Sequence, residues 1–143
     1  MATIVHNGVT LAYEDRGAGK PACVFVHGWT CNRSFFAPQA AHFARRHRVV
    51  SIDLRGHGES DKPQGPYTRA QDADGVAYVI EQLSLGPVVA VGHSMGGTIV
   101  LQLAAAYPAC VAAIVMVDPA PFVFAPDQRA GMAGPSVLAT STS

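Results

Sequence analysis

Residues 88–100 of the chain read VVAVGHSMGGTIV, in which one serine among three glycines separates two apolar segments. Gly92, Ser94 and Gly96 give the pattern G-x-S-x-G. A serine at a sharp turn from a strand into a helix takes up strained backbone angles, and glycines beside it let the two backbones approach closely. The stretch therefore predicts a strand, a turn and a helix that present Ser94 above a sheet, at a helix N-terminus whose dipole favours negative charge.

Apolar segments of strand length alternate with helix-length segments on both sides of this turn. The expected strands are 22–28, 48–56, 86–92 and 110–118, and the expected helices are 35–46, 69–83 and 95–107. Thr68 and Gln71 have the spacing of a capping box before the second helix. Asn7-Gly8 lies between two alternating segments and predicts an antiparallel hairpin. These elements predict an α/β fold: a doubly wound, mainly parallel sheet with an N-terminal antiparallel hairpin.

Glycine-rich or polar stretches follow each of the four expected buried strands. They read HGW (27–29), DLRGHGES (53–60), GHSMGG (92–97) and DPAP (118–121). Catalytic groups of parallel sheets gather at the carboxyl ends of the strands. We therefore expect the four stretches to meet at one edge of the sheet.

The composition limits the classes of partner. The chain has 143 residues, no formal net charge and 49% apolar residues, which is typical of one globular domain. No lysine- and arginine-rich run suggests a nucleic-acid partner, and no apolar run approaches the roughly 20 residues that cross a bilayer. The three cysteines lack a C-x-x-C spacing, which predicts no metal site and a reducing, cytoplasmic location. We expect no cofactor.

The C-terminal stretch carries weaker signals. We expect the domain to occupy residues 1–126, followed by DQRAGMAGPSVLATSTS (127–143), which is predicted to be a disordered or truncated tail. Without a further strand, the apolar segment 110–118 would be an exposed sheet edge. Copies of the chain could self-associate through such an edge.

Four stretches of the chain, taken together, resemble the α/β-hydrolase superfamily. They are VFVHGW, SIDLRGHGES, VVAVGHSMGG and IVMVDPAP. The resemblance is to the branch that holds serine esterases, cofactor-free haloperoxidase-like enzymes and enol-lactonases. It implies an α/β-hydrolase fold that is truncated after about the sixth strand.

The resemblance also implies a chemistry. Ser94 would be the nucleophile, and the backbone N–H groups of Met95 and Trp29 would form the oxyanion hole. The nucleophile elbow would comprise Gly92, His93, Gly96 and Gly97. Family members that cleave carbon–halogen bonds or epoxides use an aspartate at the elbow. Ser94 instead favours acyl transfer from a small-molecule carboxylic ester or lactone through an acyl-enzyme.

Residues around the nucleophile are expected to support it structurally. By resemblance, His27 and Gly28 are structural residues near the site, and His57 shapes a glycine-rich turn. We expect Asp53 and Arg55 to form a buried or half-buried ion pair that holds the loop after their strand.

The serine also needs a base and an acid. In the family the catalytic histidine follows the acid, but no histidine follows Ser94 in this chain. His93 is adjacent to Ser94, yet neighbouring side chains at a tight turn point apart, so we expect it to pack or to bond a loop. Asp118 is a candidate acid, with the turning of the exit loop as its alternative role. The chain is therefore expected to be the N-terminal part of a longer hydrolase, weak or inactive alone.

Two other classes of protein compete with this interpretation. The first is a catalytically dead α/β-hydrolase-like binding or interaction domain, which the retained glycines and Ser94 disfavour without excluding it. The second is a nucleotide-binding α/β domain. GHSMGGT does not match G-x-G-x-x-G, and the chain contains no G-x-x-x-x-G-K-[ST], so this second class has little support.

Overall fold

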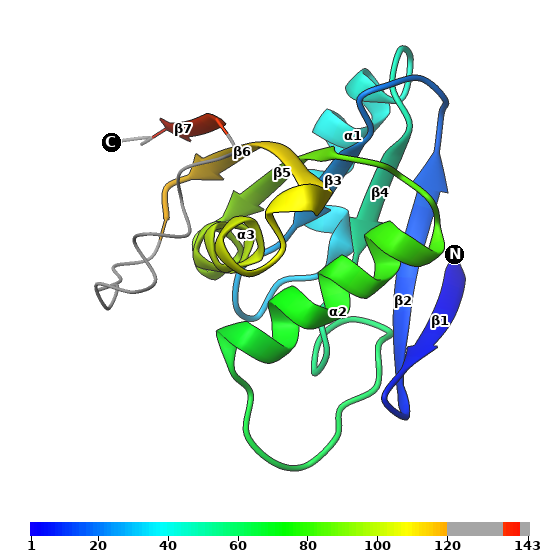
Figure 1. Ribbon diagram of the computed structural model, residues 1–143. Helices are drawn as coiled ribbons and strands as arrows, with labels where there is room; N and C mark the ends of the chain where they lie inside the picture. Colours follow the sequence, from blue (N-terminus) through cyan, green and yellow to red (C-terminus); the bar gives the residue numbers. More distant parts are fainter. Residues whose placement is uncertain (120–135, 141–143) are drawn as a thin grey trace.

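One sheet with helices on both faces makes up the computed structural model, which describes residues 1–119 and 136–140 (Figure 1). The strands are β1 (Ala2–His6), β2 (Val9–Arg16), β3 (Cys23–Val26), β4 (Val49–Ile52), β5 (Val88–His93), β6 (Val111–Val117) and β7 (Ser136–Thr140). The α-helices are α1 (Ala37–Phe43), α2 (Arg69–Gln82) and α3 (Met95–Ala106), and the short 3₁₀ helices are η1 (Arg33–Phe36) and η2 (Pro108–Cys110). The strand order is β1-β2-β4-β3-β5-β6-β7.

Strand directions confirm the predicted α/β class. β2 runs antiparallel to β1 and to β4, whereas β4, β3, β5, β6 and β7 run parallel to one another. The hairpin turns at Asn7 and Gly8, whose φ angles are 50° and 76°. Both positions of a type I′ turn require positive φ, which asparagine and glycine tolerate best, so the local sequence sets this turn.

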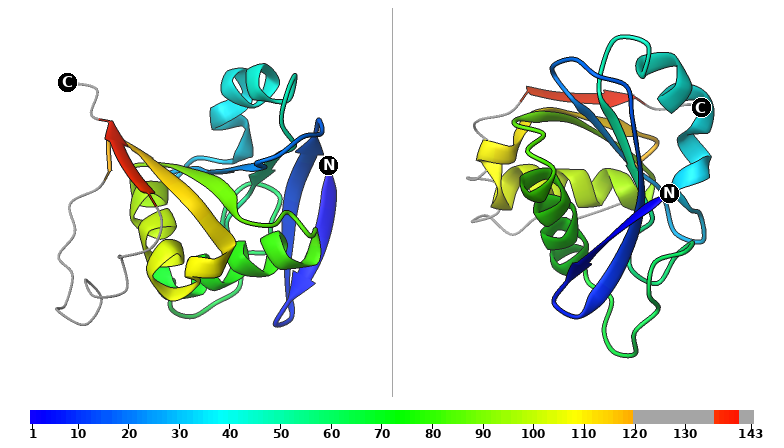
Figure 2. Two further views of the ribbon diagram at one scale, coloured as in Figure 1. Left: turned by 45° about the horizontal axis from the view of Figure 1, so that its top comes forward. Right: turned by 90° about the vertical axis from the view of Figure 1, so that its right-hand side faces the viewer.

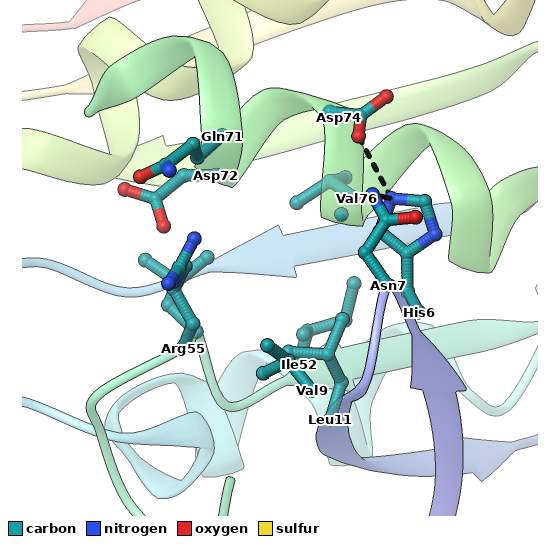
Figure 3. A pocket seen from close by; sticks show the side chains of 12 residues that line it. His6, Asn7, Val9, Leu11, Ile52, Arg55, Gln71, Asp72, Asp74 and Val76 are labelled. Carbon is teal, nitrogen blue, oxygen red and sulfur yellow. Dashed lines mark hydrogen bonds and ion pairs between the residues drawn. The ribbon is translucent and has the colours of Figure 1, made fainter. Parts of the chain in front are cut away.

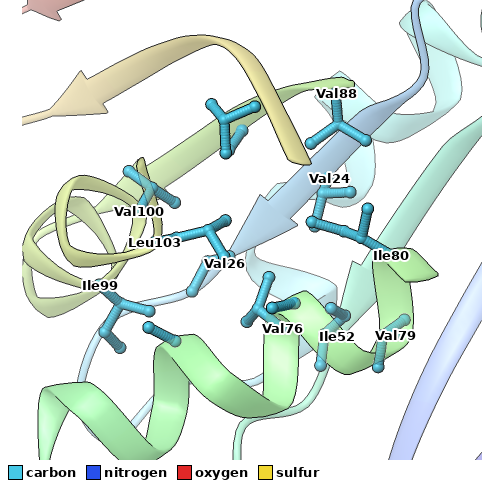
Figure 4. Close-up of a cluster of buried hydrophobic side chains, with 14 of the residues drawn as sticks. Val24, Val26, Ile52, Val76, Val79, Ile80, Val88, Ile99, Val100 and Leu103 are labelled. Carbon is cyan, nitrogen blue, oxygen red and sulfur yellow. The ribbon is translucent and has the colours of Figure 1, made fainter. Parts of the chain in front are cut away.

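Side chains of the central strands point alternately to the two faces of the sheet and form one hydrophobic core on each face. Val24 and Val26 of β3 point to the face that α2 and α3 cover, while Cys23 and Phe25 pack with Phe36 on the face that α1 covers. Figure 2 shows these helices on opposite sides of the sheet, and Figure 4 shows the larger core beneath α2 and α3. Side chains of a strand point alternately to its two faces, so a strand covered on both faces is apolar throughout.

Two helix boundaries illustrate local control. The Thr68 side chain accepts from the Gln71 N–H, and the Gln71 side chain accepts from the Thr68 N–H, both at 3.1 Å, which is the predicted capping box of α2. The helix expected at 35–46 is shorter, because the chain first forms η1. Asn32 caps η1 by accepting from the Ser34 N–H at 2.9 Å, and α1 then runs only over Ala37–Phe43.

β7 corrects the expectation for the C-terminal stretch. Residues 136–140, expected within a disordered tail, pair in parallel with β6 from Ala113 opposite Ser136 to Val117 opposite Thr140. Unpaired strand N–H and C=O groups need partners, and this pairing supplies them for β6. The β6 edge on which self-association was expected to occur is therefore covered. The remaining tail residues, 127–135 and 141–143, lie outside the described part of the chain.

Helices of the described segments are all too short or too polar to span a bilayer.

Close backbone contacts lock α3 against the sheet at its N-terminus. A Cβ atom on Gly96 would overlap the carbonyl oxygen of Val26 and lie 2.6 Å from that of His27. A Cβ atom on Gly92 would overlap the carbonyl oxygen of Gly96. Side chains larger than hydrogen at these two positions would force α3 away from β3 and β5.

A side-chain link ties the N-terminal hairpin to both helices of the larger core. The Asp74 carboxylate on α2 accepts from His6 Nε2 and from the Tyr107 hydroxyl, each at 2.7 Å. The imidazole of His6 also stacks on Tyr78, with 4.2 Å between the ring centroids. The hydrogen bonds, first that from His6 and then that from Tyr107, lower the pKa of Asp74 below its ordinary value of 3.8.

A glycine-to-alanine pair tests the close approach of α3. We expect Gly96→Ala to lower the free energy of unfolding by about 3 kcal/mol, because the new methyl group meets backbone that cannot move aside. Gly75→Ala is the matched control, since the atom nearest to its Cβ is Leu11 Cδ1 at 3.4 Å and the residue lies inside α2. We expect Gly75→Ala to raise the free energy of unfolding by about 0.5–1 kcal/mol. Urea unfolding measures the change in the free energy of unfolding for each variant. Equal changes in Gly96→Ala and Gly75→Ala would contradict the close packing of α3 on the sheet.

The Asp74 link predicts a pH dependence. A carboxylate whose pKa is lowered on folding stabilises the fold fully above its unfolded pKa, and the contribution disappears as pH falls through the folded pKa. Relative to Asp74→Asn, the wild-type chain should therefore lose stability as pH falls below 3.8. Glu81→Gln, at an exposed carboxylate of the same helix, is the control. A stability difference that stays constant from pH 6 to pH 2 would refute the link.

Candidate active site

Ser94 lies at the sharp turn from β5 into α3, with φ of 53° and ψ of −115°. Non-glycine residues rarely adopt such angles, and the cost of about 1–3 kcal/mol is characteristic of functional turns. The surrounding backbone holds the turn, because the Ser94 N–H donates to the Val117 carbonyl at 3.1 Å and the Gly97 N–H donates to the Ser94 carbonyl at 2.9 Å. The predicted strand, turn and helix are all present.

The loop that carries Trp29 lies directly beside this serine. A Cβ atom on Gly28 would lie only 3.3 Å from Ser94 Cβ. The Cys31 N–H donates to the Gly28 carbonyl at 3.2 Å and Thr30 has a φ of 64°, the pattern of a type II turn with Trp29 at its first central position. Loop and cap hydrogen bonds of the described residues include none from the N–H of Trp29 or of Met95.

An open pocket of about 590 Å³ joins these groups. Its lining residues come from four loops and helices: Trp29, Arg55, Gly56, His57, Tyr67, Arg69, Asp72, Ser94 and Met95. Trp29 is 74% exposed, so its indole covers the rim of the pocket rather than a core. The pocket thus combines the Ser94 side chain, the residues Trp29 and Met95, aromatic walls and charged side chains.

His27 supports the loop through both ring nitrogens. Nε2 accepts from the Leu54 N–H at 3.0 Å, so the hydrogen of the neutral ring is on Nδ1, which donates to the Gly28 carbonyl at 2.7 Å. Burial, foremost, lowers the pKa of this histidine, and the nearby His57 lowers it further. A neutral His27 therefore joins the end of β4 to the Gly28 loop.

Asp53 does not form the expected ion pair with Arg55. Its fully buried carboxylate accepts from the backbone N–H of Arg33 at 2.6 Å and of Glu59 at 2.9 Å, and it pairs with the Arg33 guanidinium. A Cβ atom on Gly58 would overlap this carboxylate. Asp53 faces the loop before η1, so Arg33 reaches it and Arg55 does not. The expected pair is wrong, although Asp53 does hold the loop after its strand.

Arg55 points to the other side, into the cavity beneath α2. Its guanidinium lies 5.1 Å from the ring centroid of Tyr67, a cation–π contact, and its Nε atom is buried without a hydrogen-bond partner. Asp72 of α2 lines the same cavity, and its Oδ1 atom is also buried without a partner. Burial, the largest cause, raises the pKa of Asp72 to about 6.

Within the described segments, no histidine forms a hydrogen bond with the Ser94 hydroxyl. His57 lines the Ser94 pocket, but its Nδ1 contacts the Arg55 carbonyl at 3.1 Å. His93 stacks on Phe35, with 4.4 Å between the ring centroids, and its Nδ1 faces Gly28. It therefore packs, as the turn geometry suggested. The other three, His6, His42 and His47, line cavities to which Ser94 does not contribute.

Asp118 ends β6 on the same sheet edge, with a φ of 48°. Its side chain is exposed and does not line the Ser94 pocket. The adjacent Pro119 packs close to Gly97, since a Cβ atom there would lie 3.1 Å from Pro119 Cβ. The described residues thus show a turn-forming position for Asp118 and no contact between its carboxylate and a histidine.

Sequence reasoning missed Arg33 and Asp72. The partner of Asp53 comes from a distant loop, so no local spacing could have shown it. Asp72 does carry a signal, because it precedes Val76 by four residues and Val79 by seven on the apolar stripe of α2. A carboxylate on the buried face of a helix is unusual and often functional.

Comparisons with known proteins agree with this geometry. The sequence matches the family model for the alpha/beta hydrolase fold over residues 21–139. It is 36% identical over 115 residues to a 2-(acetamidomethylene)succinate hydrolase of Mesorhizobium japonicum, covering 80% of this chain and 41% of that protein.

Two solved structures share the fold. An N-acyl homoserine lactone degrading enzyme, Est816, superposes with a TM-score of 0.80 at 34% identity, over 82% of this chain and 45% of that one. An enol-lactonase from Burkholderia xenovorans superposes with a TM-score of 0.78 at 30% identity, over 82% and 46%. The chain therefore spans less than half the length of these relatives, and the family match over most of its residues shows that it belongs to the alpha/beta hydrolase fold family.

Proposed function

We propose that the chain carries the nucleophile and oxyanion hole of a serine hydrolase that acts on small-molecule carboxylic esters or lactones. The observation that supports this most is the position of Ser94, in a strained turn beside the free N–H groups of Trp29 and Met95. A binding domain has no need for such a turn. The relatives whose names specify lactones or an acetamidomethylene compound are hydrolytic enzymes, which supports the same class of substrate.

The proposed reaction is acyl transfer. Ser94 Oγ forms a bond to the carbonyl carbon, the hydroxyl proton passes to a base, and the carbonyl oxygen becomes an oxyanion between the N–H groups of Trp29 and Met95. The ester C–O bond then breaks, and the base returns the proton to the leaving oxygen. An ester releases its alcohol, whereas an opened lactone keeps the new hydroxyl group on the acyl chain. Water later cleaves the acyl-enzyme and restores the serine. Two preorganised donors of this kind stabilise the oxyanion by several kcal/mol.

The base and the acid of this reaction remain predictions. No described histidine forms a hydrogen bond with the Ser94 hydroxyl, and the exposed Asp118 stays the candidate acid from the sequence. We propose weak turnover for the chain by itself, because an unactivated serine hydroxyl is a poor nucleophile. The cytoplasmic location is likewise proposed, from the three free cysteines.

A binding or interaction domain without catalysis is the second candidate. The observation that favours it is the lack of a hydrogen bond from any described side chain to the Ser94 hydroxyl. Such a domain would bind ligands in the Ser94 pocket without forming a covalent intermediate.

Covalent labelling separates the two candidates. We expect a fluorophosphonate probe to label the folded chain at Ser94, because the oxyanion hole stabilises the tetrahedral adduct even where the base is weak. Ser94→Ala should abolish the label, and Ser34→Ala, at an exposed serine of η1, should retain it. Intact mass spectrometry with peptide mapping reads the result. A folded chain without label at Ser94 would favour the binding domain.

The backbone role of Trp29 can be tested through its turn. Proline suits the first central position of a type II turn and lacks an N–H, so Trp29→Pro should keep the loop and remove the donor. We expect the labelling rate at Ser94 to fall about 100-fold in Trp29→Pro. The labelling rate should fall far less in Trp29→Ala, because this variant keeps the backbone N–H. Far-ultraviolet circular dichroism checks that both variants fold. Equal labelling rates in Trp29→Pro and Trp29→Ala would show that loss of the indole, and not of the N–H, slows labelling.

A further inference from the structure

A second cavity adjoins the Ser94 pocket and contains two buried polar atoms without partners. It has a volume of about 290 Å³ and lies between the N-terminal hairpin, β4 and α2 (Figure 3). Arg55 and Asp72 line both this cavity and the Ser94 pocket, so they stand at the boundary between the two.

The polar pair is costly to the fold as it stands. Asp72 is only 6% exposed, and its carboxylate takes part in no hydrogen bond or ion pair with the described residues. Arg55 Nε is buried and unpaired as well. Unpaired buried polar groups destabilise a fold, and more so when they are charged. Such groups call for an explanation, and a bound ligand that supplies their partners is one.

The chemistry of the pair selects its ligand. Arg55 can only donate, while an ionised Asp72 can only accept. A carboxylate ligand would accept from Arg55 but would be repelled by Asp72. An ammonium ligand would donate to Asp72 but would be repelled by Arg55. A secondary amide presents an accepting carbonyl beside a donating N–H and satisfies both. Figure 3 shows the Arg55 and Asp72 side chains directed toward one another at one end of the cavity.

The rest of the cavity indicates what lies beyond the amide. Apolar side chains line one part of it: Val9, Leu11, Ile52, Leu54 and Val76. Polar side chains, among them His6, Asn7 and Gln71, line the remainder. A volume of about 290 Å³ exceeds what one hydroxyl or water molecule fills, and it suits a short hydrocarbon chain.

We propose that Arg55 and Asp72 form a subsite for the secondary amide of an N-acylamino ester or lactone. The acyl chain would occupy the apolar cavity, the amide would bridge the two side chains, and the ester carbonyl would reach Ser94. This inference rests on the proposed function, since it names the substrate class of the same site.

Equilibrium binding tests the subsite independently of catalysis. Trp29 is the sole tryptophan and lines the Ser94 pocket, so its fluorescence reports binding to the Ser94→Ala chain. We expect methyl N-hexanoylglycinate to bind at least tenfold more tightly than its N-methyl analogue, which lacks the N–H. Methyl 3-hydroxyoctanoate, which lacks the amide, should also bind at least tenfold more weakly than methyl N-hexanoylglycinate.

Variants assign the preference to the pair. Asp72→Leu should remove the tenfold difference between the N–H and N-methyl ligands and, by removing an unpaired buried carboxylate, should not destabilise the fold. Arg55→Met should weaken the binding of both amides. Exposed residues provide matched controls, Glu81→Leu and Arg45→Met, which should leave both affinities unchanged. If Asp72→Leu fails to fold, Asp72→Asn, which retains an accepting oxygen, should preserve binding and the preference in reduced form.

The outcomes separate the two proposals. Equal binding of the three ligands, or a tenfold preference that persists in Asp72→Leu, would overturn the subsite whatever the fluorophosphonate result. Tighter binding of the hydroxy ester than of the amide would show that the subsite does not select an amide. Amide selectivity together with no labelling of Ser94 would instead support the subsite in a binding protein and reject the hydrolase.

Discussion

The contact of α3 with the carbonyl groups of β3 is the constraint on which the rest of the site depends. Because Gly96 lacks a side chain, the helix N-terminus can rest on the backbone of Val26 and His27. That contact brings the Gly28 loop beside Ser94, and it leaves the N–H groups of Trp29 and Met95 near the same position. The proposed nucleophile and its proposed donors are therefore positioned by the packing of backbone against backbone.

Buried charges around this contact divide into two kinds. Asp53 is satisfied by two backbone N–H groups and by Arg33, and it fixes the loops on the η1 side. Asp72, on the α2 side, has no such partners, and burial keeps its pKa near 6. Satisfied charges make a structure more rigid, whereas unsatisfied charges are a cost that a ligand can offset. The two sides of the sheet edge thus differ: Asp53 supports the loops on one side, and the proposed subsite lies on the other.

The features that could be predicted from the sequence are those with local causes. The hairpin at Asn7-Gly8, the capping box at Thr68 and the turn at Ser94 each depend on a few neighbouring residues, and all three are present. The Asp53 partner could not be predicted, because Arg33 is twenty residues away and reaches it only through the fold. The pairing of β7 with β6 was missed for a related reason. Its strand signal is weak locally, and an apolar neighbouring strand determines it.

The strand order has a consequence for how the chain folds. β3 lies between β4 and β5, so the first parallel strand of the chain acquires its second partner only when residues 88–93 are available. The Ser94 turn, in turn, rests on carbonyl groups about seventy residues earlier in the chain. Contacts this distant in sequence are slow to form, because closing a long loop costs entropy before any contact repays it. During synthesis on the ribosome, the Ser94 turn would therefore assemble later than the N-terminal hairpin, and earlier intermediates would expose apolar strands.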